Sequence, residues 1–196
     1  MDASLNEKVK VSIQNLRDKK SRIYLLVQDT KGNARASVRL IYQMAKSLLD
    51  SGFNPIILHE KNDYAGIVAW MDEEYMSIPH RAIEGQNLEI APEDFIVIPE
   101  IFGFIMEQIK NLPCGKIVLT QNYSHIVETL QPGQNWAQYG FFKCITTTKK
   151  QQEYIETVMR QSSFDIIKPL ITENFFPKEL PAMPIIGVHT KEQEDT

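Results

Sequence analysis

The loop KGNAR, residues 31–35, has the composition of an anion site and lies between a short apolar run and a long amphipathic one. Gly32 permits a tight turn and the close approach of a ligand, and the side chain of Asn33 suits the cap of a following helix. Free backbone N–H groups at a helix start attract anions, and Arg35 and Arg39 add positive charge on one helix face. We therefore expect Gly32, Asn33 and Arg35 to face a phosphate.

An alternative explanation of this loop needs no ligand. Cations at a helix N-terminus oppose the helix dipole, and Asp29 is close enough in sequence to compensate for them. The loop matches neither the Walker phosphate loop nor a complete GxGxxG pattern. A phosphate-facing loop and a plain capped turn both remain open at this point.

Polar residues also follow two other apolar runs, at positions where a sheet presents its ligand groups. Glu100 ends the run DFIVIPE, and Gln121 and Asn122 follow the run KIVLT. Amide groups can hydrogen-bond sugar hydroxyls, although amides are also common in loops and caps. For Glu100 the alternative is a place in the first turn of the next helix, where a carboxylate suits the dipole.

The remaining reactive residue types form no recognisable catalytic or metal-binding pattern. The four histidines, with His125 in an expected helix, lack metal-ligand spacing and are treated as plain polar residues. Thr148 and Gln151 have the spacing of a capping box. Cys114 and Cys144 lie thirty residues apart, and we expect buried, reduced thiols. The sequence therefore predicts no metal and no bound cofactor.

Short apolar runs alternate with amphipathic segments and would position these residues. Continuous apolar runs predict strands that are covered on both faces, as in a parallel sheet, and the alternation indicates a doubly wound, mainly parallel α/β sheet. Strands are expected at residues 22–28, 54–60, 94–100, 115–122, 141–147 and 164–169. Helices are expected at residues 5–19, 38–49, 101–112 and 148–160, with a short one within 64–76.

Residues 170–196 differ in character from the rest of the chain. Residues 170–183 contain two prolines and no periodicity, which is typical of a linker. Residues 184–190 form a new apolar run, which either joins the edge of the sheet or opens a second domain. We divide the chain into an N-terminal helical extension (1–21), a Rossmann-like domain (22–169), a linker (170–183) and the start of a further, missing or truncated domain (184–196).

Composition and charge restrict the class of protein. The 196 residues are 43% hydrophobic and 23% charged with a net charge of −4, so we expect a globular domain without a broad nucleic-acid footprint. Neither a signal peptide nor a membrane span is visible, which predicts a cytoplasmic location. The basic start of the chain is interpreted as solubilising charge; the alternative is peripheral contact with anionic lipid at the inner membrane face.

Taken in order, several segments resemble the N-terminal half of a GT-B glycosyltransferase of the retaining group 1, family 4-like class, which includes sucrose synthase-like and mannosyltransferase enzymes. The segments are VQDTKGNARASVRLIYQMAKSLLDSGFNPIIL, DFIVIPE, KIVLTQN, CITTTKKQQEYI, IIKPLITENFF and IIGV. The chain departs from the family pattern at four places. Asn33 replaces the second glycine of the first loop, Gln121 replaces the cleft histidine, Thr148 replaces a serine, and the Pro-Asn-Gly hinge is absent after Pro169.

The resemblance implies an acceptor-side domain of a hexosyltransferase that moves a sugar from a nucleotide-sugar donor to a polysaccharide or lipid-linked glycan. It implies that Gly32 and Asn33 approach the donor diphosphate, and that Glu100, Gln121 and Asn122 line the acceptor side. It also implies metal-independent catalysis and a C-terminal domain that grips the donor, so this chain alone would have little activity. The alternatives are a nucleotide-sugar epimerase of the same architecture and a non-catalytic, flavodoxin-like interaction module.

Overall fold

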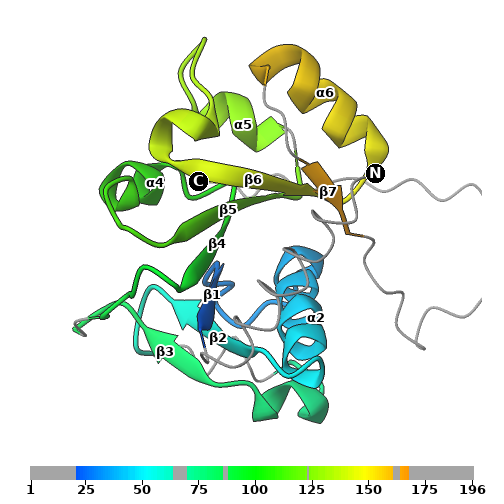
Figure 1. The fold of residues 1–196 in the computed structure, drawn as a ribbon. Helices are drawn as coiled ribbons and strands as arrows, with labels where there is room; N and C mark the ends of the chain where they lie inside the picture. Colours follow the sequence, from blue (N-terminus) through cyan, green and yellow to red (C-terminus); the bar gives the residue numbers. More distant parts are fainter. Residues whose placement is uncertain (1–20, 64–69, 86–87, 123, 161–163, 168–196) are drawn as a thin grey trace, which may run out of the picture.

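Seven parallel strands form the sheet at the centre of the protein (Figure 1). The computed structural model describes residues 21–63, 70–85, 88–122, 124–160 and 164–167. The strands are β1 (Arg22–Val27), β2 (Asn54–His59), β3 (His80–Ala82), β4 (Phe95–Pro99), β5 (Gly115–Thr120), β6 (Phe141–Thr146) and β7 (Phe164–Ile166). Their order across the sheet is β3-β2-β1-β4-β5-β6-β7. The predicted α/β, Rossmann-like, doubly wound fold is therefore confirmed.

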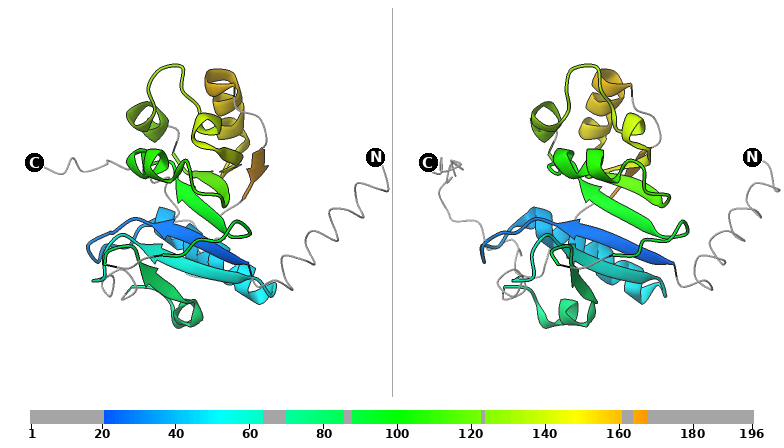
Figure 2. Two further views of the ribbon diagram at one scale, coloured as in Figure 1. Left: turned by 60° about the vertical axis from the view of Figure 1, so that its left-hand side comes forward. Right: turned by 90° about the vertical axis from the view of Figure 1, so that its left-hand side faces the viewer.

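Helices pack against both faces of the sheet, which explains why the strands are continuous apolar runs (Figure 2). One face packs against α2 (Ala36–Asp50) and the short helix η1 (Glu73–Ser77). The other face packs against α4 (Gly103–Ile109), α5 (Ser124–Thr129), η2 (Trp136–Tyr139) and α6 (Lys149–Met159). Within β1, Leu25 and Val27 contribute to the first layer, while Tyr24 and Leu26 contribute to the second.

The strand order reverses at β1, and this reversal creates a crevice. The chain moves from β1 to β2 and β3 on one side, and from β4 through β7 on the other. The loops that leave the carboxyl ends of β1 and β4 therefore run in opposite directions. In open α/β sheets, ligands bind at this point.

The structure differs from the expected elements in a few places. The strand β3 was not predicted, because its three residues, His80–Ala82, contain no apolar run. The expected helix over 101–112 is limited to Gly103–Ile109. The predicted N-terminal extension, the linker and the strand at 184–190 lie outside the described residues. Within the described part of the chain, no helix is both long and apolar enough to cross a membrane.

Gly103 allows α4 to begin in close contact with α5. A Cβ atom added at Gly103 would lie 2.7 Å from Cβ and 2.8 Å from the carbonyl oxygen of Thr129. Overpacking of this kind costs about 1–3 kcal/mol, which exceeds the roughly 1 kcal/mol gained when alanine replaces glycine in a helix. Gly103→Ala is thus expected to lower the urea midpoint of unfolding. The exposed variant Ser47→Ala in α2 is the control and should raise the midpoint or leave it unchanged.

Candidate functional site

A polar cleft of about 390 Å³ lies at the carboxyl edge of the sheet, between the loops that follow β1 and β4. Its polar side chains come from the loops after four strands and from two helices: Gln28 and Arg35 after β1, Ser37 in α2, Glu100 after β4, Gln121 and Asn122 after β5, His125 in α5, and Thr147 after β6. Residues that are far apart in the sequence, predicted separately as a phosphate side and an acceptor side, thus line one cleft.

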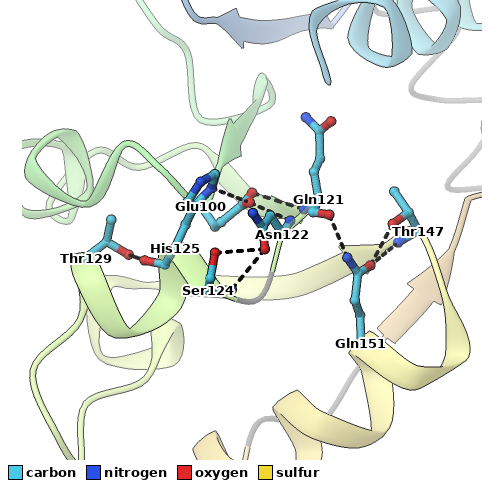
Figure 3. Close-up of polar contacts among 8 residues, drawn as sticks. All are labelled: Glu100, Gln121, Asn122, Ser124, His125, Thr129, Thr147 and Gln151. Carbon is cyan, nitrogen blue, oxygen red and sulfur yellow. Dashed lines mark hydrogen bonds and ion pairs between the residues drawn. The ribbon is translucent and has the colours of Figure 1, made fainter. Parts of the chain in front are cut away.

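Glu100 organises the wall of the cleft rather than offering a free carboxylate (Figure 3). Its side chain is only 1% exposed. One carboxylate oxygen accepts a hydrogen bond from the backbone N–H of Gln121 at 3.1 Å, and the other accepts one from the N–H of Asn122 at 2.8 Å. Because α4 begins at Gly103, Glu100 precedes that helix and does not lie in its first turn. The carboxylate thus fixes the turn between β5 and α5.

His125 also binds the carboxylate of Glu100, and no sequence pattern singles this histidine out. Its Nδ1 atom lies 3.2 Å from Oε1 of Glu100, and its side chain is 32% exposed. A carboxylate can only accept a hydrogen bond, so Nδ1 carries the proton and Nε2 keeps a lone pair in the neutral ring. His125 lines the cleft, and its neutral ring keeps Nε2 as a hydrogen-bond acceptor.

Asn122 and Gln121 have different surroundings. The side-chain oxygen of Asn122 accepts hydrogen bonds from the N–H and the hydroxyl of Ser124, at 3.1 and 2.9 Å, so Asn122 shapes the start of α5. The side chain of Gln121 extends away from this network in Figure 3. Gln121 is consequently the amide whose side chain is better placed for a ligand.

Gln151 connects the loops after β5 and β6. Its amide nitrogen donates to the backbone carbonyl of Gln121 at 2.6 Å, and its oxygen accepts from the N–H of Thr147 at 3.0 Å. The Thr148 hydroxyl accepts from the N–H of Gln151 at 3.2 Å. Half of the predicted capping box is therefore formed, while the side chain of Gln151 supports the cleft floor through Gln121 and Thr147.

The predicted phosphate loop forms a tight turn at the surface. Lys31 and Gly32 have φ angles of 49° and 80°, and the N–H of Asn33 donates to the carbonyl of Thr30 at 2.9 Å, as in a type I′ turn. The cap of α2 is Arg35, which makes no side-chain capping bond. The prediction that Asn33 caps this helix was therefore wrong, because the turn separates Asn33 from the helix start.

The cations near this turn are directed to different places. Arg35 lines the cleft, whereas Gly32 and Asn33 are exposed and lie outside its lining. Arg39 forms an ion pair with Asp72 at 2.8 Å and lies over the ring of Trp70. Only Arg35, of the three residues predicted to face a phosphate, thus reaches the cleft with Glu100, Gln121 and Asn122.

Two other groups of reactive side chains have structural explanations. The rings of His59 and His80 stack with centroids 5.1 Å apart, and burial together with the charge of His80 lowers the pKa of His59 to about 3. Burial raises the pKa of Cys144 to about 12, and both cysteines are buried free thiols, as expected. Among the described residues, no three acidic, histidine or cysteine side chains gather as metal ligands.

Comparison with known proteins found no matching protein-family model and no matching curated protein.

Proposed function

We propose that this chain is the acceptor-side domain of a GT-B glycosyltransferase, and that its cleft binds a hydroxyl-rich, anionic substrate. The observation that carries the proposal is the position of Arg35, Gln121 and His125 around one cleft, at the point where the strand order reverses. This combination supplies one fixed positive charge, an amide and an imidazole acceptor. These are the groups that recognise a phosphorylated or nucleotide-linked sugar.

Each of these residues has a separate chemical role on this proposal. The guanidinium of Arg35 binds a phosphate or carboxylate oxygen, and the amide of Gln121 exchanges hydrogen bonds with sugar hydroxyls. Nε2 of His125 accepts a hydrogen bond or a proton from an acceptor hydroxyl. Glu100 and Asn122 hold the loop that presents them. The domain thus orients the acceptor rather than attacking the sugar.

The donor diphosphate would approach from the exposed turn at the rim of the cleft. Backbone N–H groups at the start of α2 would attract an anion in the manner of helix N-termini. A second domain would supply the remaining donor contacts, with the nucleotide sugar as co-substrate and no metal cofactor. The 196-residue chain is therefore expected to bind nucleotide sugars weakly and to transfer sugar slowly or not at all.

Titration of the ¹⁵N-labelled chain with nucleotide sugars, sugar phosphates and free sugars tests the proposal. Shifts concentrated at the amides of Gln121 and Asn122 and at the ring of His125 would support it. Ligand-induced shifts confined to the far side of the sheet, or no shifts at millimolar ligand, would rule out a sugar site in the cleft.

The variant Arg35→Ala is expected to weaken binding of a sugar phosphate by about 10- to 100-fold, the equivalent of a hydrogen bond to a charged group worth about 1.5–3 kcal/mol. Arg39→Ala is the matched control, because it removes the same charge one helical turn away, where the guanidinium pairs with Asp72. Equal weakening by both variants would indicate non-specific attraction and contradict a site at Arg35. Isothermal titration at constant ionic strength makes the comparison.

A further inference from the structure

An apolar groove of about 480 Å³ runs beside α2 on the face of the sheet opposite α4, α5 and α6. Among the described residues, the helices on this face are α2 and η1, and they cover the half of the sheet around β1 and β2. The floor of the groove consists of side chains from four strands: Ile23, Phe95, Ile117 and Ile145. Its wall is the side of α2 that carries Met44 and Leu48.

An exposed apolar groove of this kind is expected to be covered by another part of the protein or by a partner. Parallel strands are normally covered on both faces, and each Å² of apolar surface left in water forgoes about 25 cal/mol. The other face of β5 and β6 is already packed against the helices that follow β4, β5 and β6. In the described part of the chain, no element packs beside α2 over the starts of β4 and β5.

The segment before β1 enters the fold at the mouth of this groove. β1 begins at Arg22, whose backbone N–H is held by Asp94 at 2.8 Å, and the next residue, Ile23, lines the groove. Residues 1–20 lie outside the described part of the chain. Wherever that segment runs, it starts from the edge of the groove.

The sequence of this segment has the pattern that the groove requires. Leu5, Val9, Ile13 and Leu16 are spaced by four, four and three residues, which places them on one face of a helix. Val11 falls on the opposite face, among charged residues. From Leu5 to Leu16 a helix rises about 16 Å at 1.5 Å per residue. The groove wall on α2, from Leu40 to Ser51, has the same number of residues and hence the same length.

We propose that residues 1–20 dock into this groove as an amphipathic helix, parallel to α2, with Leu5, Val9, Ile13 and Leu16 against the sheet. The chain then completes its own second layer, and Lys8 and Lys10 lie off the docked face. The groove and the candidate cleft share Leu40 of α2 and otherwise have different lining residues. The docking therefore does not depend on the proposed sugar site.

Cysteine cross-linking in the full chain tests the docking. Ser47 is exposed on the rim of the groove, and the native thiols Cys114 and Cys144 are buried. Ser47→Cys combined with Ile13→Cys should form an intramolecular disulfide about tenfold faster than Ser47→Cys combined with Val11→Cys, because docking raises the effective concentration of one pair only. Thermal unfolding provides a second measurement, in which Val9→Asp with Ile13→Asp should lower Tm more than Val11→Asp.

Three outcomes would overturn the proposal. Equal cross-linking rates for the two cysteine pairs would show that the segment is not held in one orientation. Disulfide-linked dimers, formed in preference to the intramolecular bond, would assign the groove to a second copy of the chain. Binding of the segment to vesicles of anionic phospholipid, without cross-linking, would assign its apolar face to lipid.

Discussion

Glu100→Gln is expected to lower the free energy of unfolding by about 1–3 kcal/mol, the cost of leaving a buried polar group without its partner. The Glu100 carboxylate accepts hydrogen bonds from two backbone N–H groups and lies 3.2 Å from the ring of His125. Glutamine has one accepting oxygen and one donating nitrogen. At least one of the backbone donors, at Gln121 or Asn122, would therefore lose its acceptor inside the protein.

The same variant should also weaken ligand binding in the cleft, because the turn that presents Gln121 and His125 loses its anchor. Chemical denaturation measures the first effect, and the titration with sugar phosphates measures the second. Glu128→Gln is the control, since Glu128 is an exposed residue of α5 and its substitution should change stability by less than about 0.5 kcal/mol. If Glu100→Gln were as stable as the control, the carboxylate would not be the anchor of the turn.

The fold followed from the sequence because its strands are covered on both faces. Runs such as Tyr24–Val27 in β1 supply apolar side chains to both layers, so the pattern is continuous rather than alternating. The alternation with helices then indicated the parallel, doubly wound sheet. The strand β3 was not predicted because the prediction relied on apolar runs, and its residues His80 and Arg81 are polar. That strand is defined by pairing with β2.

The candidate site could be predicted only in part from the sequence, because the cleft is formed by contacts between loops that are distant in the sequence. Strand ends identified Glu100, Gln121 and Asn122, and the topology brings them together with Arg35. No local pattern pairs Glu100 with His125, which are 25 residues apart. The turn at Gly32 was correctly expected to be tight. Lys31 also adopts a positive φ, and the turn formed by these two residues separates Asn33 from the helix start.

At the opposite edge of the sheet, Asp94→Ala is expected to destabilise the protein by about 3 kcal/mol, the lower end of the cost of breaking a buried ion pair. The Asp94 side chain is 2% exposed, and its Oδ2 atom accepts two hydrogen bonds from the Arg22 guanidinium, at 2.7 and 3.1 Å. The backbone N–H groups of Arg22 and Ala91 donate to Oδ1 and Oδ2 respectively, each at 2.8 Å. Because the Arg22 side chain is 28% exposed, water can partly replace its lost partner.

The pH dependence of stability distinguishes this ion pair from simple packing. Burial by itself would raise the pKa of Asp94, but the hydrogen bonds from Arg22 and Ala91 outweigh burial and hold the pKa below 3.8. A carboxyl group whose pKa is lower in the folded state stabilises the protein fully above its unfolded pKa, and this contribution is lost as the pH falls through the folded value. The stability difference between the wild-type chain and Asp94→Asn should therefore be constant near neutral pH and shrink below about pH 4.

Urea unfolding at a series of pH values measures this difference. Asp165→Asn is the matched control, because Asp165 pairs with Lys143 at 2.9 Å but is 64% exposed, and exposed pairs contribute at most about 1 kcal/mol. A difference between wild type and Asp94→Asn that stays constant down to pH 3 would show that the lost stability comes from packing. A difference that shrinks below about pH 4 would show that the charged Asp94 carboxylate stabilises the protein by holding the start of β1 against the start of β4.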